Sequence, residues 1–357
     1  SDRRIVVGTD PPYPVVVGSD LLERAAALVA ASPTPRRVAI VTHPEVAVIA
    51  KDVAASFSAA DIEVSSFEAP SGEATKSLAS AEDLLSAFAG AGLERSDVVV
   101  GVGGGVVTDL TGFVASTYHR GIRCAYVPTT LLAQVDASIG GKTAVNLPEG
   151  KNLVGTYHHP LAVVCDVRTL GSLPDKEFVS GLAEVAKYGF IQDPDLLDLI
   201  EADADRLRAR DPALLEEIVT RCVAIKAAIV AVDERDGGPR AILNYGHTVG
   251  HALEAARHGT LRHGEAVALG MMAAVHCAHA LGYADEDLVQ RHRAVLSLLG
   301  LPTAIDTSFD ELAPYIMRDK KASGGPRFVL LRGLARPEYG IEIDPGVVAG
   351  ALERLSA

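Results

Sequence analysis

Short runs of β-branched residues alternate with alanine- and leucine-rich runs over the first half of the chain. The strand-like runs include V-V-V-G at 15–18, R-R-V-A-I-V-T at 36–42 and D-V-V-V-G-V at 97–102. Between them apolar residues recur at helical spacing, as in the stretch from about Leu78 to Ala91. This alternation predicts a parallel sheet with helices on both faces.

The pattern changes near residue 170, where Gly171-Ser172-Leu173-Pro174 ends the strand-like runs. Beyond it the apolar positions follow helical spacing, and two Asp-Pro pairs are typical helix starts. A length of 357 residues also favours two domains over a single core. We therefore predict an α/β domain over 1–170 and an all-α domain over 171–357, with a basic loop and a short hairpin near the C-terminus.

Amino-acid composition and charge limit the kinds of molecule that this chain is expected to bind. The chain is 48% apolar and 22% charged, which is typical of a globular protein with a large core. A formal charge of −13, with no basic run, argues against nucleic acid and anionic membranes as partners. No apolar run approaches membrane-spanning length, and the N-terminus does not have the pattern of a signal peptide. Four scattered cysteines indicate buried thiols, so we expect a cytoplasmic protein.

A glycine-rich turn follows the strand-like run at 97–102. Gly103, Gly104 and Gly105 lead directly into a helical stretch that carries Asp109. A turn of this kind places backbone N–H groups and a helix N-terminus against a phosphate. The spacing departs from G-x-G-x-x-G because Val106 replaces the last glycine, so a plain tight turn is the alternative.

Polar side chains crowd the next segment, between residues 126 and 155. Thr129 and Thr130 end a strand-like run, and Asp136 lies within an apolar stretch. Amines and amides then gather around glycines, at Lys142, Asn146, Lys151 and Asn152. Lysine binds phosphate as a point charge and asparagine adds directed donors, so the group predicts an anion site. Solvated lysines in an ordinary loop remain the alternative.

Candidate metal ligands lie in the second half. His247 and His251 are four residues apart, so a helix would present both from one face, an arrangement that suits zinc. Helix capping or core hydrogen bonds would explain them equally well. Glu184 lies in a weakly polar segment, where a metal or Lys187 would offset its burial; a surface pair of the two is the alternative. Lys226 is the only charge in eleven residues, so we expect it to face an anion or to reach the helix edge.

Taken together, the motifs resemble the 3-dehydroquinate synthase family of sugar-phosphate cyclases. The matching stretches include G-E-A-T-K-S-L at 72–78, V-G-G-G-V-V-T-D-L-T-G-F at 102–113 and P-T-T-L-L-A-Q-V-D-A-S-I-G-G-K-T at 128–143. They continue with G-K-N-L-V-G at 150–155, L-P-D-K-E-F-V-S-G-L-A-E-V-A-K at 173–187 and L-N-Y-G-H-T-V-G-H-A-L-E at 243–254. The stretches run in family order over nearly the whole chain. The resemblance implies a Rossmann-like dinucleotide-binding domain followed by a helical metal- and substrate-binding domain.

The resemblance also implies roles for individual residues. Zinc, or cobalt in its place, would be held by Glu184, His247 and His263, so His251 would assist proton movement near the phosphate instead of binding metal. The implied catalytic residues are Lys142, Lys187, Lys226, Asn244 and His251. The implied substrate-binding residues are Arg120, Asn152, Arg240, Lys320 and Lys321, with one of the last two in contact. NAD would be held by Glu73, Lys76, Gly104, Gly105, Asp109, Thr129, Thr130, Asp136 and Lys151.

The implied substrate is a sugar-acid phosphate, 3-deoxy-D-arabino-heptulosonate 7-phosphate. NAD would oxidise one hydroxyl, phosphate would leave, NADH would return the hydride, and an intramolecular aldol step would close the ring of 3-dehydroquinate. The implied activity is that of a phosphate-eliminating lyase of the shikimate pathway. The resemblance further implies a homodimer.

Two positions depart from the family pattern. Ala144 replaces a usual glycine, and His43 replaces an aspartate that many relatives carry near the adenosine ribose. Neither removes catalytic chemistry, but they leave room for an aminodehydroquinate synthase, which closes the nitrogen analogue of the substrate in 3-amino-5-hydroxybenzoate biosynthesis. A metal-dependent polyol dehydrogenase fits less well, because that class lacks the lysine and asparagine cluster. A non-catalytic regulator derived from a cyclase is the remaining alternative.

Overall fold

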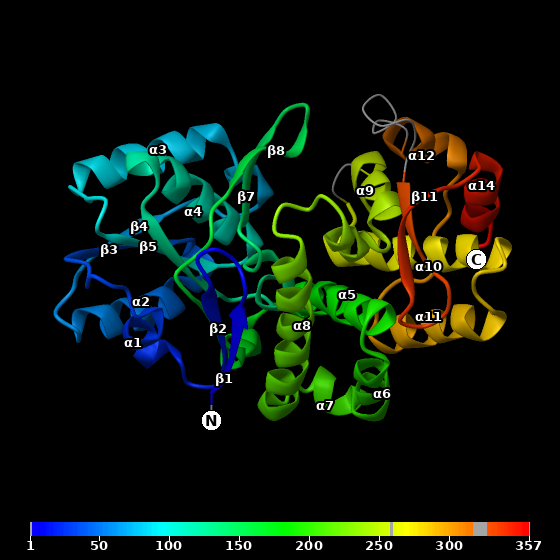
Figure 1. Cartoon of the computed structure of the whole chain (residues 1–357), viewed down its shortest axis with the longest axis horizontal. Helices are drawn as coiled ribbons and strands as arrows, with labels where there is room; N and C mark the ends of the chain where they lie inside the picture. Colours follow the sequence, from blue (N-terminus) through cyan, green and yellow to red (C-terminus); the bar gives the residue numbers. More distant parts are fainter. Residues whose placement is uncertain (1, 258–259, 317–326, 357) are drawn as a thin grey trace. The chain divides into compact units, whose positions relative to one another are not determined.

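The computed structural model describes residues 2–257, 260–316 and 327–356 (Figure 1). The chain forms two compact units. The first consists of Ser1–Leu173 together with Pro212–Arg235, and the second of Pro174–Asp211 together with Asp236–Ala357. None of the described helices is both long and apolar enough to cross a bilayer.

A seven-stranded sheet forms the centre of the first unit, within the part of the chain described, in the order β1-β2-β9-β6-β5-β3-β4. Among the described strands of this sheet, only the β1–β2 pair is antiparallel. Residues of β5 are buried throughout, which is why its sequence is a continuous apolar run without alternation. The strands are β1 Arg3–Val7, β2 Tyr13–Gly18, β3 Arg37–Thr42, β4 Glu63–Glu68, β5 Val98–Gly103, β6 Arg123–Pro128 and β9 Val163–Asp166.

Helices cover both faces of this sheet, as the alternating pattern predicts. Figure 1 shows α1 and α2 on one face and α3 and α4 on the other. Val53 and Phe57 of α2 pack with Ile40 of β3 and Val100 of β5 in one buried cluster. The helices are α1 Ala25–Val29, α2 Ala47–Ser58, α3 Leu78–Gly90 and α4 Gly105–Thr117.

One long helix, α8 Pro212–Val232, belongs to the first unit, although the sequence places it in the second domain. It packs against β1, β2 and a π-helical turn at Ala133–Ala137. The predicted boundary at 170 lies three residues from the end of the first segment, Leu173. The prediction does not include the return of the chain to the first unit at α8. The apolar face of a helix does not reveal which hydrophobic core it packs against.

The polar segment after the glycine turn is a β-hairpin and not an open loop. Strands β7 Lys142–Leu147 and β8 Gly150–Tyr157 pair antiparallel. Thr143 and Val145 point inward, and β7 lies against α4. A Cβ on Gly112 of α4 would come within 2.3 Å of Thr143 Cγ2, so glycine allows this close approach.

The second unit is built around α10 His263–Ala280, whose residues from Ala266 to Ala278 are all buried. Helices α5, α9, α11 and α14 pack against it. The predicted short hairpin near the C-terminus is confirmed as β10 Arg327–Leu331 and β11 Pro337–Glu342, so the unit is helical with one β element. Its helices are α5 Asp175–Ile191, α6 Pro194–Ala202, α7 Ala204–Arg208, α9 His247–Ala256, α10, α11 Glu286–Leu298, α12 Phe309–Ile316 and α14 Pro345–Glu353.

Candidate functional site

An ion pair lies inside the second unit, on α5. Glu184 and Lys187 have side chains 0% and 1% exposed and form an i,i+3 pair. The sequence left a surface pair open as an alternative, and the burial of both side chains excludes it. Two buried charges are costly unless each finds an opposite charge, so this carboxylate sits where a cation is strongly favoured.

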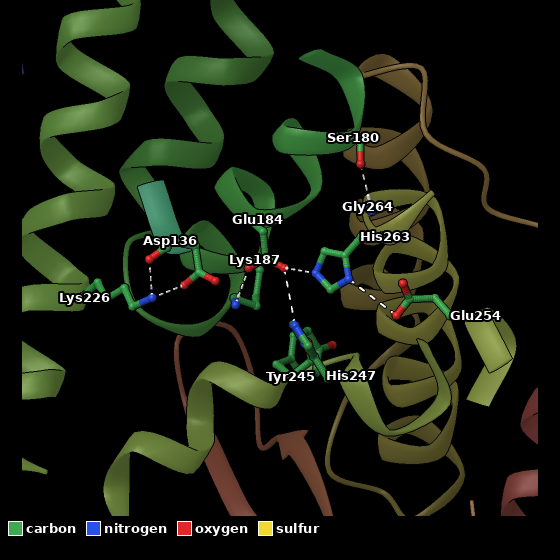
Figure 2. Close-up of polar contacts among 10 residues, drawn as sticks. All are labelled: Asp136, Ser180, Glu184, Lys187, Lys226, Tyr245, His247, Glu254, His263 and Gly264. Atoms are coloured by element: carbon green, nitrogen blue, oxygen red, sulfur yellow. Dashed lines mark hydrogen bonds and ion pairs between the residues drawn. The ribbon is translucent and has the colours of Figure 1, made fainter. Parts of the chain in front are cut away.

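Two histidines point at the same carboxylate from other helices (Figure 2). His247 begins α9 and His263 begins α10, and each places Nε2 3.4 Å from Glu184 Oε1. The ligand atoms of the three residues lie within 4.8 Å of one another. Two imidazole nitrogens and one carboxylate oxygen form a donor set that suits zinc and leaves a coordination position for substrate. The structure thus brings together the three residues that the family resemblance assigns to metal.

Close backbone packing joins the start of α10 to α5 and the start of α9 to α10. A Cβ on Gly264 would lie 1.9 Å from the carbonyl oxygen of Ser180, and the Gly264 N–H donates to Ser180 Oγ at 3.0 Å. Gly246 has φ +79° just before α9, and a Cβ on Gly270 would lie 1.8 Å from its carbonyl oxygen. Sequence reasoning missed Ser180 and these glycines; Ser180 and Gly246 lie inside matching family stretches, but Gly270 does not.

Each metal-site histidine also has an acceptor facing its second ring nitrogen. His247 Nδ1 lies 3.1 Å from the carbonyl oxygen of Tyr245, whose hydroxyl is 2.9 Å from His292 Nε2. The Nδ1–H therefore donates to a carbonyl, and the Nε2 lone pair faces Glu184. Burial lowers the pKa of His247 to about 3, so this ring is neutral.

The second ring has a different electrostatic environment. Burial alone lowers the pKa of His263, but hydrogen bonding to Glu184 and Glu254 outweighs it and raises the pKa to about 10. His263 is thus an imidazolium between two carboxylates. A metal ion would displace its Nε2 proton, so metal binding at this group releases a proton.

The other predicted residues of this unit that the structure describes are His251, Arg240 and Asn244. The ring centroid of His251 lies 5.2 Å from that of His247, and its side chain is exposed. Arg240 is buried and Asn244 is exposed, both in the turn Pro239–Asn244. Lys320 and Lys321 lie outside the described residues.

The first unit gathers most of the predicted dinucleotide ligands near the carboxyl ends of β5 and β6. The Thr129 N–H donates to the Gly103 carbonyl at 2.9 Å, and a Cβ on Gly104 would lie 2.9 Å from Thr130 Cγ2. These glycines let backbone, rather than side chains, line the turn before α4. Gly105 is the first residue of that helix.

A polar network surrounds the same turn. Lys76 forms an ion pair with Asp109 and donates to Asn152 Oδ1 at 2.5 Å. Asn146 donates to Glu73 Oε1 at 2.7 Å and its Oδ1 accepts from the Asn152 N–H at 2.9 Å. Asn152, which the resemblance assigns to substrate, therefore lies among the residues assigned to NAD.

Lys226 has the anionic partner that its isolation in the sequence predicts. Its Nζ donates to Asp136 Oδ1 at 2.5 Å and to the Asp136 carbonyl at 2.6 Å (Figure 2). The contact joins α8 to the π-helical turn within the first unit. The remaining predicted residues of this unit, Arg120, Lys142 and Lys151, are exposed.

Asp109 gives a pH-dependent prediction. Burial raises its pKa from 3.8 to about 6, against the opposing effect of Lys76. A carboxyl group whose pKa is higher in the folded state stabilises the fold at pH values below its unfolded-state pKa. This contribution is lost as the pH rises through the folded-state pKa. The free energy of unfolding, taken relative to that of Asp109→Asn, should fall by roughly 2 kcal/mol between about pH 4 and pH 7. Urea unfolding of both proteins across this range measures it, and a constant difference would contradict it.

Comparison with known proteins agrees with this geometry. The family model described as "3-dehydroquinate synthase N-terminal" matches residues 66–180, and "3-dehydroquinate synthase C-terminal" matches residues 181–322. A 3-dehydroquinate synthase from Thermobifida fusca (strain YX) is 46% identical over 353 residues, covering 98% of this chain and 95% of the relative. The chain belongs to the 3-dehydroquinate synthase family. The predicted class of activity, a phosphate-eliminating cyclisation by a lyase, is therefore confirmed.

Solved structures place the 3-dehydroquinate synthase fold among sugar-phosphate cyclases. A 2-deoxy-scyllo-inosose synthase complexed with carbaglucose-6-phosphate, NAD+ and Co2+ aligns with a TM-score of 0.89 and 27% identity, covering 99% of each chain. A 2-epi-5-epi-valiolone synthase from Streptomyces hygroscopicus subsp. jinggangensis 5008, with NAD+ and Zn2+ bound, aligns with a TM-score of 0.88 and 29% identity over 96% of each chain. The predicted fold class, a Rossmann-like α/β unit with a helical unit, is confirmed.

Proposed function

We propose that this chain converts 3-deoxy-D-arabino-heptulosonate 7-phosphate to 3-dehydroquinate and phosphate, with NAD bound by the first unit and a divalent metal by the second. The observation that carries the metal assignment is the convergence of Glu184, His247 and His263 around one point. The cofactor assignment is supported by structural relatives that hold NAD+ with Co2+ or Zn2+. Small-molecule chemistry also agrees with the charge of −13, which disfavours nucleic acid.

The second unit would hold the metal and position the substrate. Glu184, His247 and His263 fit zinc or cobalt, which when bound lowers the pKa of a coordinated hydroxyl. Lys187, one turn from Glu184, supplies a buried ammonium beside the ion site. His251 of α9 is exposed and its ring centroid lies 5.2 Å from that of His247, so it would carry a proton to or from the substrate.

The first unit would bind the dinucleotide. The turn through Gly103 and Gly104 offers backbone N–H groups and the N-terminus of α4 to a pyrophosphate. When bound, NAD supplies a hydride acceptor that is regenerated in each turnover. Glu73, Lys76, Asp109, Thr129, Thr130, Asp136 and Lys151 remain the proposed side-chain contacts.

The experiment that tests the function follows phosphate and NADH together. With substrate, NAD and Zn2+, we expect one phosphate released per molecule consumed and no net NADH, because the hydride returns within the turnover. Pretreatment with a chelator should stop turnover, and Zn2+ or Co2+ should restore it. Accumulation of NADH from simple polyols, without phosphate release, would instead indicate a dehydrogenase.

The same assay separates the two cyclase alternatives. Comparing kcat/KM for the oxygen substrate and its amino analogue shows which one this chain serves, and the high identity to 3-dehydroquinate synthases supports the oxygen substrate. We further propose a cytoplasmic homodimer, in line with the family resemblance and with four free, buried cysteines. Sedimentation of the purified protein tests the dimer.

A further inference from the structure

We propose that Glu254 is a positioning residue for the metal site: it accepts a hydrogen bond from His263 Nδ1 and so directs His263 Nε2 toward Glu184. The inference rests on the proposed metal function. Glu254 lies in the last turn of α9, seven residues after His247. Its Oε2 is 3.5 Å from His263 Nδ1, and the opposite ring nitrogen is 3.4 Å from Glu184 Oε1. The imidazole therefore lies between two carboxylates (Figure 2).

The two metal-site rings differ in how firmly their surroundings hold them. The His247 side chain is 11% exposed and has a backbone carbonyl facing Nδ1. The His263 side chain is 29% exposed, so packing restrains it less, and the acceptor facing its Nδ1 is a carboxylate. A carboxylate acceptor fixes the tautomer, orients the ring and raises its basicity as a ligand. The separation of 3.5 Å is at the outer limit of hydrogen bonding, but Glu254 is 12% exposed, so solvent screens the attraction only partly.

The same residues also suggest a second metal site, and the test must distinguish this arrangement from the positioning role. The ligand atoms of His251, Glu254 and His263 also lie within 4.8 Å of one another, as in a second metal site. A neutral imidazole has one lone pair, so His263 could serve both sites only by losing its second ring proton. The positioning role needs no such step, and it keeps Glu254 bound to a proton donor. We therefore assign Glu254 to His263 and not to a second ion.

The test measures metal binding by Glu254→Gln, which preserves size and removes the charge. We expect Co2+ affinity, measured by competition with a chelator, to fall about 10–100-fold. The d–d absorption of the Co2+ protein should also change, because the ring orientation around the ion changes. We expect kcat to fall while the KM for NAD stays the same. Glu353→Gln, an equal charge change at an exposed position of α14, is the matched control and should match the unmodified protein.

Three results would overturn the assignment. The first is Co2+ affinity and spectrum in Glu254→Gln equal to those of the control. The second is two metal ions per chain in the unmodified protein and one in Glu254→Gln, which would make Glu254 a ligand. The third is a melting temperature of Glu254→Gln that falls below that of the unmodified protein by the same amount without metal as with metal. Such a result would show a purely structural role. Failure of the proposed function looks different: the unmodified chain would then bind no Co2+ or release no phosphate.

Discussion

Glu184→Gln is expected to abolish turnover and to lower the free energy of unfolding by about 3–5 kcal/mol, because it leaves the Lys187 ammonium buried beside a neutral amide. It also removes the negative charge toward which both histidine Nε2 atoms point. Phosphate release measures the first effect and urea unfolding of the metal-free protein measures the second.

A double variant separates the two effects. Adding Lys187→Met to Glu184→Gln removes the buried charge, so most of the lost stability should return while activity stays absent. Glu177→Gln is the control on the same helix; its side chain is 51% exposed and pairs with Arg262, so stability should change by less than about 1 kcal/mol. Substantial phosphate release by Glu184→Gln would show that this carboxylate is not part of the catalytic site.

Gly264→Ala is expected to destabilise the second unit by about 3 kcal/mol or more. The new Cβ would lie 1.9 Å from the Ser180 carbonyl oxygen, so the start of α10 must move away from α5. The move also displaces His263, the neighbouring residue, from Glu184. Thermal unfolding measures the loss of stability, and Co2+ binding measures the loss of site geometry.

A second glycine in the same unit provides the control for this substitution. A Cβ on Gly350 of α14 would meet nothing within 4 Å. Gly350→Ala should therefore raise stability by up to about 1 kcal/mol through helix propensity. Equal effects of the two substitutions would contradict the close contact between α5 and α10.

Short sequence patterns predict those structural features that depend on residues close together in the chain. The continuous apolar run of β5 indicates a buried parallel strand, and the glycines after it indicate a turn before a helix. Finding the proposed metal ligands required more than periodicity. Spacing alone pairs His247 with His251, whereas His263 faces Glu184 because two glycine contacts bring three helices together. Only the family resemblance, which carries that tertiary information, pointed to the three residues that the structure brings together.

The missed features depend on contacts between distant residues. The return of α8 to the first unit, the burial of Lys187 and the position of Glu254 beside His263 each depend on which surfaces meet. The β7–β8 hairpin was hidden for another reason. Its lysines, asparagines and glycines are typical of loops, and Thr143 and Val145 face inward only because α4 lies beneath them.

The path of α8 has a consequence for dividing this protein into fragments. The backbone leaves the first unit after Leu173, re-enters at Pro212 and departs again after Arg235, so three covalent crossings join the units. A fragment cut at the first crossing would lose the helix that packs on β1 and β2, together with the Lys226 ammonium that pairs with Asp136. A cut at this point therefore does not yield two fragments that each fold alone. Reassembly from separately made fragments would require α8 to be part of the N-terminal fragment.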